Sequence, residues 1–172
     1  MIQVSFISEQ KLKDIVPISS NNTITAPLKQ SMWDAQEMYI KPILCHPLYD
    51  EIAGQIVTNT ISVANQTLLD VIAPCLSYYT LYKYLPYNWA KIREQGVLNQ
   101  TGTTAVTISL NDLTFMRGEA EASAKMYEIR LVNFLENNKS TYPLYKCDCI
   151  CNLSCDNISV SKIRLNDLFD YI

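Results

Sequence analysis

The spacing of apolar and polar residues predicts five helices, and the first two lie within residues 6–41. A short helix is predicted over residues 6–16, because Ser8 is a favourable N-cap and Pro17 cannot continue a helix. A second helix is predicted over residues 26–41, where apolar residues recur every three or four positions. We expect Pro42 to close this second helix.

The third and fourth predicted helices carry most of the apolar residues. The third starts at His46-Pro47 and places three side chains on one face: Leu48, Ile52 and Ile56. The fourth runs over residues 63–85 and has no charge between residues 71 and 82, which is typical of a helix buried on most sides. Its uncharged stretch is shorter than the ~20 residues that a membrane span requires. Pro74 lies inside it, where we expect a kink.

The fifth helix has the clearest signals. Ser109 and Asp112 fit a capping box, and Asn137-Asn138 ends the pattern. Residues 118–124 are mostly small, so another helix can approach closely. The spacing also predicts two ion pairs, Arg117–Glu121 and Glu121–Lys125. The apolar stripe consists of Leu113, Met116, Ala120, Ala124, Tyr127, Leu131 and Phe134.

Two segments do not read as helices. Residues 89–108 combine turn-forming residues with a β-branched run, which predicts a small β-hairpin or flap. Residues 144–172 form a Cys-rich tail of mixed, partly extended character. The fold class is therefore mainly α: a bundle of about four to five helices with a small β-hairpin flap, in which residues 1–143 form the helical domain and residues 144–172 the tail.

Composition and charge narrow the possible functions. Hydrophobic residues make up 48% of the 172 residues and charged residues 18%, which is typical of one globular domain. The net charge is −3, and the 14 basic residues are scattered, which disfavours tight DNA binding. Eleven tyrosines favour half-buried surfaces and interfaces. The start of the chain does not resemble a signal peptide, so we expect the cysteines to begin reduced in a cytoplasm.

Candidate catalytic chemistry rests on the single histidine, His46, which is next to Cys45. A Cys–His pair can supply a nucleophile and its base, but the two side chains must face each other. Adjacent residues at a helix entrance usually point apart, so we interpret His46 as an N-cap. Phosphate-binding glycine motifs and a nucleophile elbow are absent from the sequence. We expect neither an enzyme nor a cofactor.

Four cysteines crowd into one short segment: Cys147, Cys149, Cys151 and Cys155. Four thiolates can bind zinc, but zinc sites usually begin with C-x₂₋₄-C spacing, which only Cys151 and Cys155 fit. In an extended strand, Cys147 and Cys151 lie about 13 Å apart, too far for one ion. Packing as small apolar side chains on one face of a strand is the simpler interpretation. A small zinc-stabilised module and a disulfide formed after lysis stay open as alternatives.

Four segments resemble a family of small phage head–tail connector (head completion or adaptor) proteins of Bacteroidetes and crAss-like phages. The segments are Phe6-Ile7-Ser8-Glu9 to Leu12-Lys13; Tyr39-Ile40-Lys41-Pro42-Ile43-Leu44 with Leu48-Tyr49; Tyr84-Leu85-Pro86 with Gly96-Val97; and Arg130-Leu131 to Asn137 with Tyr142-Pro143. Their order and spacing carry the resemblance, which covers residues 6–143. The family motif usually has Gly where Cys45 stands, and the Cys-rich tail has no counterpart.

The resemblance implies a structural virion protein that is assembled in the host cytoplasm and located at the neck of the particle. Its partners would be sister copies in a ring of about twelve (a dodecamer), the portal protein and neighbouring tail or neck rings. It would line part of the DNA channel without sequence-specific binding and would not contact a membrane. The flap and the tail are natural segments to reach a neighbour, and the candidate interface residues are Trp89, Arg93, Val97, Val106, Ile108, Ile158, Val160, Phe169 and Tyr171.

Overall fold

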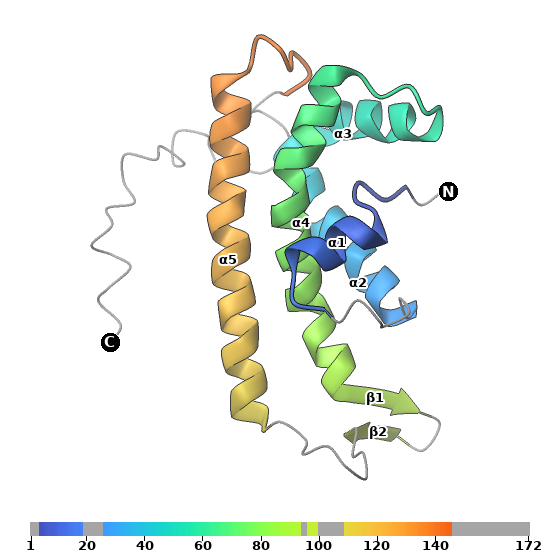
Figure 1. The fold of residues 1–172 in the computed structure, drawn as a ribbon, viewed down its shortest axis with the longest axis vertical. Helices are drawn as coiled ribbons and strands as arrows, with labels where there is room; N and C mark the ends of the chain where they lie inside the picture. Colours follow the sequence, from blue (N-terminus) through green and yellow to red (C-terminus); the bar gives the residue numbers. More distant parts are fainter. Residues whose placement is uncertain (1–3, 19–25, 94–95, 100–108, 146–172) are drawn as a thin grey trace, which may run out of the picture.

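The computed structural model describes residues 4–18, 26–93, 96–99 and 109–145, with the backbone alone for residues 88–93 and 96–99. The described part is mainly helical, which confirms the predicted class (Figure 1). In chain order the elements are α1 (Glu9–Ile15), α2 (Ala26–Ala35), a π-helical turn η1 (Gln36–Ile40), α3 (Lys41–Val57), α4 (Val63–Trp89), β1 (Ala90–Arg93), β2 (Gly96–Asn99) and α5 (Leu110–Asn137).

Helices α4 and α5 run side by side along the long axis of the molecule (Figure 1). The predicted capping box at the start of α5 is confirmed, since Ser109 and Asp112 each accept a hydrogen bond from the other's backbone N–H. The predicted end is also confirmed, with Asn138 as the C-cap. Helix α4 begins as predicted but continues past Leu85 and through Pro86. Leu85 is buried against Leu113 of α5, and this packing holds the last turns of α4 in place.

Small residues let α4 and α5 approach each other closely, as predicted. Ala120 and Ala124 are buried, and the Cys75 thiol of α4 lies 3.8 Å from the carbonyl oxygen of Ala124. Met116 was expected in the buried stripe but is 44% exposed. Arg117 does not pair with Glu121 as expected. Its guanidinium carbon lies 4.5 Å from the ring centroid of Tyr82, where the ring face attracts the cation.

The prediction that Pro42 closes a helix is wrong. The chain passes from α2 through η1 directly into α3, and the Lys41 N–H bonds to the Gln36 carbonyl five residues back. Pro42 falls in the first turn of α3, where a missing N–H costs least. The break comes at Cys45, whose torsions (φ 63°, ψ 155°) are not helical. Cys45 therefore occupies the cap position, and the interpretation of His46 as the N-cap is also wrong.

The hydrophobic core lies where α1, α2 and η1 pack on α4, with α5 on another side of α4 (Figure 1), and buried residues of α3 join the same cluster. The N-cap role of Ser8 is confirmed, since its hydroxyl accepts a hydrogen bond from the Lys11 N–H. The predicted apolar face of the third helix is confirmed too, with Leu48 and Ile52 fully buried and Ile56 packed against the core.

Strands β1 and β2 follow α4 and pair antiparallel, with Ala90 opposite Asn99 and Arg93 opposite Gly96. They fall within the range predicted for the flap. Residues 94–95 and 100–108 lie outside the described residues, so the flap as a whole stays a prediction. After α5 the chain turns back, and Tyr142 is buried with its hydroxyl donating to the Ala64 carbonyl at 2.7 Å. The predicted tail after residue 145 lies outside the described residues.

Candidate functional site: a cleft beside helix α1

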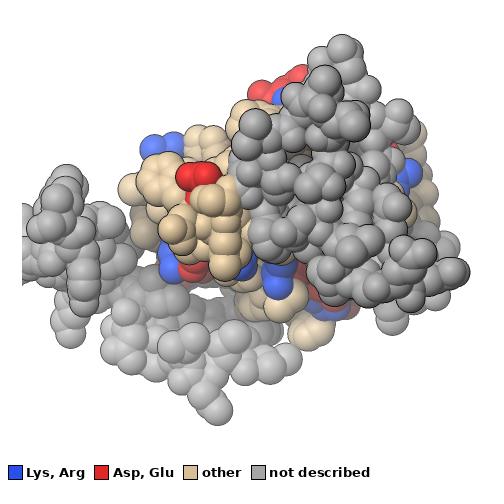
Figure 2. All heavy atoms as spheres, turned by 90° about the horizontal axis from the view of Figure 1, so that it is seen from below, with Lys and Arg blue, Asp and Glu red and all other residues tan. Residues whose placement is uncertain are grey.

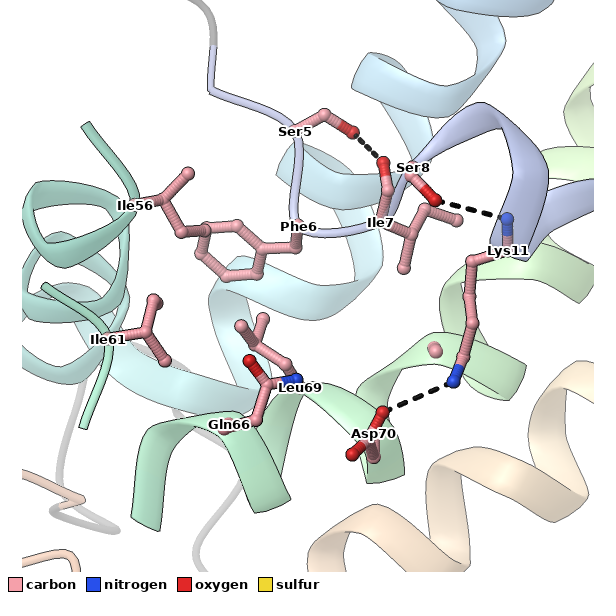
Figure 3. A pocket seen from close by; sticks show the side chains of 11 residues that line it. Ser5, Phe6, Ile7, Ser8, Lys11, Ile56, Ile61, Gln66, Leu69 and Asp70 are labelled. Atoms are coloured by element: carbon pink, nitrogen blue, oxygen red, sulfur yellow. Dashed lines mark hydrogen bonds and ion pairs between the residues drawn. The ribbon is translucent and has the colours of Figure 1, made fainter. Parts of the chain in front are cut away.

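A cleft of about 410 Å³ opens between the segment before α1, the end of α3 and the first turns of α4. Figure 3 shows the ring of Phe6 lying between Ile56, Ile61 and Leu69. Its lining is apolar in the middle and polar toward the rim. The lining residues are Ser5, Phe6, Ile7, Ser8, Lys11, Ile56, Ile61, Gln66, Leu69, Asp70 and Ala73.

The wall of the cleft that contains Phe6 is held in place by one buried amide. Gln36 of η1 is 1% exposed, and its side-chain oxygen accepts a hydrogen bond from the Phe6 N–H at 2.8 Å. Its amide nitrogen donates to the Val4 carbonyl and to the Tyr49 hydroxyl, both at 2.8 Å. The π turn thus places an amide where it satisfies the backbone of a segment about thirty residues earlier in the chain. Without Gln36, these buried backbone groups would lose their partners.

A charged pair continues this network toward the surface. The Tyr49 hydroxyl donates to one oxygen of Glu37 at 2.6 Å, and Lys41 contacts the other oxygen at 2.6 Å. Burial pushes the pKa of Glu37 upward, but the hydrogen bonds from Lys41 and Tyr49 outweigh it and leave that pKa below its usual value. Burial, and then the hydrogen bond to Glu37, raise the pKa of Tyr49 well above its usual value. Glu37 is therefore charged, and Tyr49 neutral, near neutral pH.

One ion pair crosses the rim of the cleft. Lys11 of α1 lies 3.2 Å from Asp70 of α4, and the two side chains are 47% and 57% exposed (Figure 3). Exposed pairs of this kind contribute little to stability, about 0–1 kcal/mol. Separating the two side chains therefore costs little free energy, and both charges are then accessible to a ligand. The cleft thus has an apolar floor and a polar rim.

The cysteines of the described residues do not form a reactive centre. The Cys45 side chain is buried whereas His46 is exposed, so these neighbours face different environments. Burial, and then the nearby charge of Glu128, raise the pKa of Cys75 to about 12. A thiol with that pKa is protonated at neutral pH and a poor nucleophile.

The structure describes only a few of the predicted interface residues. Trp89 ends α4, Arg93 ends β1 and Val97 lies in β2, each with its backbone alone described. Val106, Ile108, Ile158, Val160, Phe169 and Tyr171 lie outside the described residues. The cysteine segment from Cys147 to Cys155 does as well, so the zinc and disulfide alternatives stay predictions. Within the described residues, no group of three or more His, Cys, Asp or Glu side chains could hold a metal ion.

Sequence reasoning missed an apolar patch at the hairpin end of the α4–α5 pair. We use the name hairpin-end patch for three exposed apolar side chains at this end: Tyr87 near the end of α4, and Leu110 and Met116, which lie about 120° apart around the start of α5 (45%, 60% and 44% exposed). Leu110 lies directly after the N-cap residue Ser109 and before the first residue of the buried stripe. This position is the one sequence signal that the Leu110 side chain is exposed.

Charges on the described surface are mixed. Figure 2 shows basic and acidic side chains interspersed on the described part of the end seen from below, without a patch of one sign. Among the described residues, ion pairs join Lys29 with Glu9 and Lys125 with Glu121. This part of the surface does not have the clustered cations that grip a nucleic-acid backbone. No helix in the described ranges is both long enough and apolar enough to cross a membrane.

The described part of the chain is mainly helical and has a cleft beside α1. Residues 40–154, well over half of the chain, match a family of unknown function (DUF6712), and the chain belongs to this family. The match spans α3, α4, the hairpin and α5 and begins at the last residue of η1. Comparison with curated proteins and with solved structures found no match.

Proposed function

We propose that this protein is a structural subunit of a phage head–tail connector ring, which binds the portal and links the capsid to the tail. In this role the chain is not an enzyme and needs no cofactor. It is part of the virion neck, assembled in the host cytoplasm, and it borders the DNA channel without binding a particular sequence.

The observation that carries this proposal is the backbone at Cys45. The connector family that the sequence resembles usually has Gly at this position of its most recognisable motif. Cys45 has φ 63° and ψ 155°, in a region of torsion space that glycine occupies easily and other residues rarely do. The chain thus has a glycine-like turn where the resemblance calls for one. This supports a local backbone structure that is shared with the connector family, in addition to similar residues.

The distribution of apolar surface is a second support. A closed ring uses head-to-tail contacts, so each subunit needs two different contact surfaces. The cleft beside α1 and the hairpin-end patch lie at different places on the described part of the molecule. The patch is close to the strands from which the sequence predicts contacts with a neighbour or the portal. Two distinct apolar surfaces on a small helical subunit fit this requirement.

Mild acidity is compatible with a channel. Each Lys–phosphate contact adds affinity and would slow DNA that passes through. The chain has a net charge of −3, and the described surface that Figure 2 displays has no patch of one sign of charge. Such a surface permits passage of DNA.

The proposal is tested by mixing the full-length protein with the portal encoded in the same genome and measuring complex formation by native mass spectrometry. We expect a defined ring on the portal. The double variant Leu110→Glu/Met116→Glu should reduce binding at least tenfold, because it places charges in the hairpin-end patch. Met38→Glu is the matched control, since Met38 is also exposed (56%) but lies on η1. A wild-type protein that never joins the portal would contradict the proposal.

A further inference from the structure

Helix α5 has a second face that carries exposed apolar side chains among the described residues. Phe115 and Met126 are 70% and 47% exposed, and Ile129 is half-buried. Between them lie Gly118 and Ala122, both exposed. At 100° per residue these five positions fall within roughly 80° of the helix circumference, on the side opposite the stripe that packs on α4. We call them the outer face of α5.

The outer face is symmetric about its centre. Its residues follow one another at intervals of 3, 4, 4 and 3, with Ala122 in the middle. A twofold axis through Ala122 would pair this helix with an antiparallel copy of itself. Phe115 would then face Ile129 of the second copy, and Met126 would face Gly118. At the ends of the interface two large side chains, Phe115 and Ile129, would contact each other. Nearer the centre, the large Met126 side chain would contact Gly118, which has no side chain.

The space at Gly118 fits this pairing. A Cβ placed on Gly118 would meet no atom within 4 Å in the described structure. No packing among the described residues therefore requires this glycine, although it lowers helix stability relative to other residues. Close packing of a second helix would explain the glycine, because small residues allow helix axes to approach to within about 8 Å of each other.

Charges beside the outer face support the antiparallel direction. Glu121 and Lys125 lie on one flank and contact each other at 2.7 Å within the helix. The twofold axis brings Glu121 of one copy within about 3 Å, along the helix axis, of Lys125 of the other. In a parallel pair the twofold axis runs along the helices, so the two charged flanks lie on opposite sides of the interface and this Glu121–Lys125 contact between copies is lost.

We propose that the free protein forms a twofold symmetric dimer in which the outer faces of two α5 helices pack antiparallel. The interface is a short coiled-coil contact centred on Ala122, with Met126 of each copy inserted at Gly118 of the other. This dimer does not depend on the connector proposal, because it requires neither the portal nor a ring.

Sedimentation equilibrium of the full-length protein across a range of concentrations tests the dimer. We expect the wild type to be dimeric and Gly118→Met to weaken dimerisation at least tenfold by filling the space that Met126 needs. Gly54→Met is the matched control. Gly54 also has open space around its Cβ position but lies on α3, so its replacement should leave the dimer unchanged. Circular dichroism should show that both variants keep their helices.

A cross-link tests the twofold axis itself. Ala122→Cys, in a background with the four tail cysteines replaced by Ser, should form a disulfide-linked dimer under mild oxidation. Asn111→Cys should not, because its two copies would lie about 33 Å apart along the helices. A wild type that stays monomeric at all concentrations would overturn the proposal. So would a dimer or larger ring that tolerates Gly118→Met or that does not cross-link through position 122.

Discussion

Two regions of the molecule achieve order in opposite ways. The α4–α5 pair is made of two long regular helices whose buried contacts are mostly apolar, with alanines at the closest approach. The region over residues 36–49 combines a π turn, two prolines and a positive φ at Cys45, and a buried polar network centred on Gln36 holds it together. The difference suggests that irregular backbone persists here because specific hydrogen bonds fix it, whereas the helix pair depends on shape and burial.

The largest effect is expected from removing the amide of Gln36. Gln36→Leu leaves the Phe6 N–H, the Val4 carbonyl and the Tyr49 hydroxyl without this partner. We expect a loss of about 3 kcal/mol in the free energy of unfolding, measured by urea denaturation. Gln30→Leu on α2 is the control, because Gln30 is exposed and bonds only to Asp34 in the described contacts. Equal losses in both variants would mean that the buried network does not hold this region.

The stability of the α4–α5 pair should depend on the side-chain volume at the contact between the two helices. Ala124→Leu adds three carbon atoms where the Cys75 thiol lies 3.8 Å from the backbone of α5. We expect a loss of about 2 kcal/mol in thermal or urea unfolding, because overpacking forces the helices apart. Ala122→Leu, on the exposed side of the same helix, should cost under about 0.5 kcal/mol in the folding of one chain. A tolerated Ala124→Leu would show that the pair packs loosely.

Backbone strain at Cys45 predicts a difference between two substitutions. Cys45→Gly relieves the positive φ but removes a buried side chain, so its stability should stay within about 1 kcal/mol of the wild type. Cys45→Val keeps the strain and adds a β-branched side chain, and it should lose about 1.5 kcal/mol. Urea denaturation of the two variants compares them directly. If valine were tolerated as well as glycine, the turn would not be strained.

The smallest effect concerns acid stability. The pKa of Glu37 is lower in the folded protein than in the unfolded chain, so the unfolded chain binds more protons in acid. The stability that Glu37 adds is present above its unfolded pKa and is lost as the pH falls through its folded pKa. Glu37→Gln should reduce stability at pH 7 by under about 1 kcal/mol, and the difference should shrink toward pH 3. A difference that is constant with pH would exclude this cause.

The sequence predicted the helix pair better than the irregular region for a physical reason. A capping box and a stripe of small residues are local signals, so Ser109 and Ala124 could be read from their neighbours alone. Pro42 gave a local signal as well, but a helix accepts proline in its first turn, and the preceding π turn shifts the hydrogen bonds. The place of the break depends on the contacts that Cys45 and Gln36 make in the folded chain, which local spacing cannot reveal.

The candidate site was still harder to predict. The cleft combines Phe6, Ile56 and Leu69 from three separate segments, and its wall depends on the hydrogen bond between Phe6 and Gln36, thirty residues apart. Each of these residues alone reads as ordinary core. The hairpin-end patch was missed because the periodicity assigned Met116 to the buried stripe, although the helix turns its side chain outward.

The connector proposal is tested most directly by a cryo-EM map of the neck of the virion encoded by the same genome. The proposal predicts a ring of this chain directly beneath the portal, with the α4–α5 pair and the turn at Cys45 recognisable in each subunit. A neck whose density is fully explained by other chains, in particles that contain none of this protein by mass spectrometry, would contradict it.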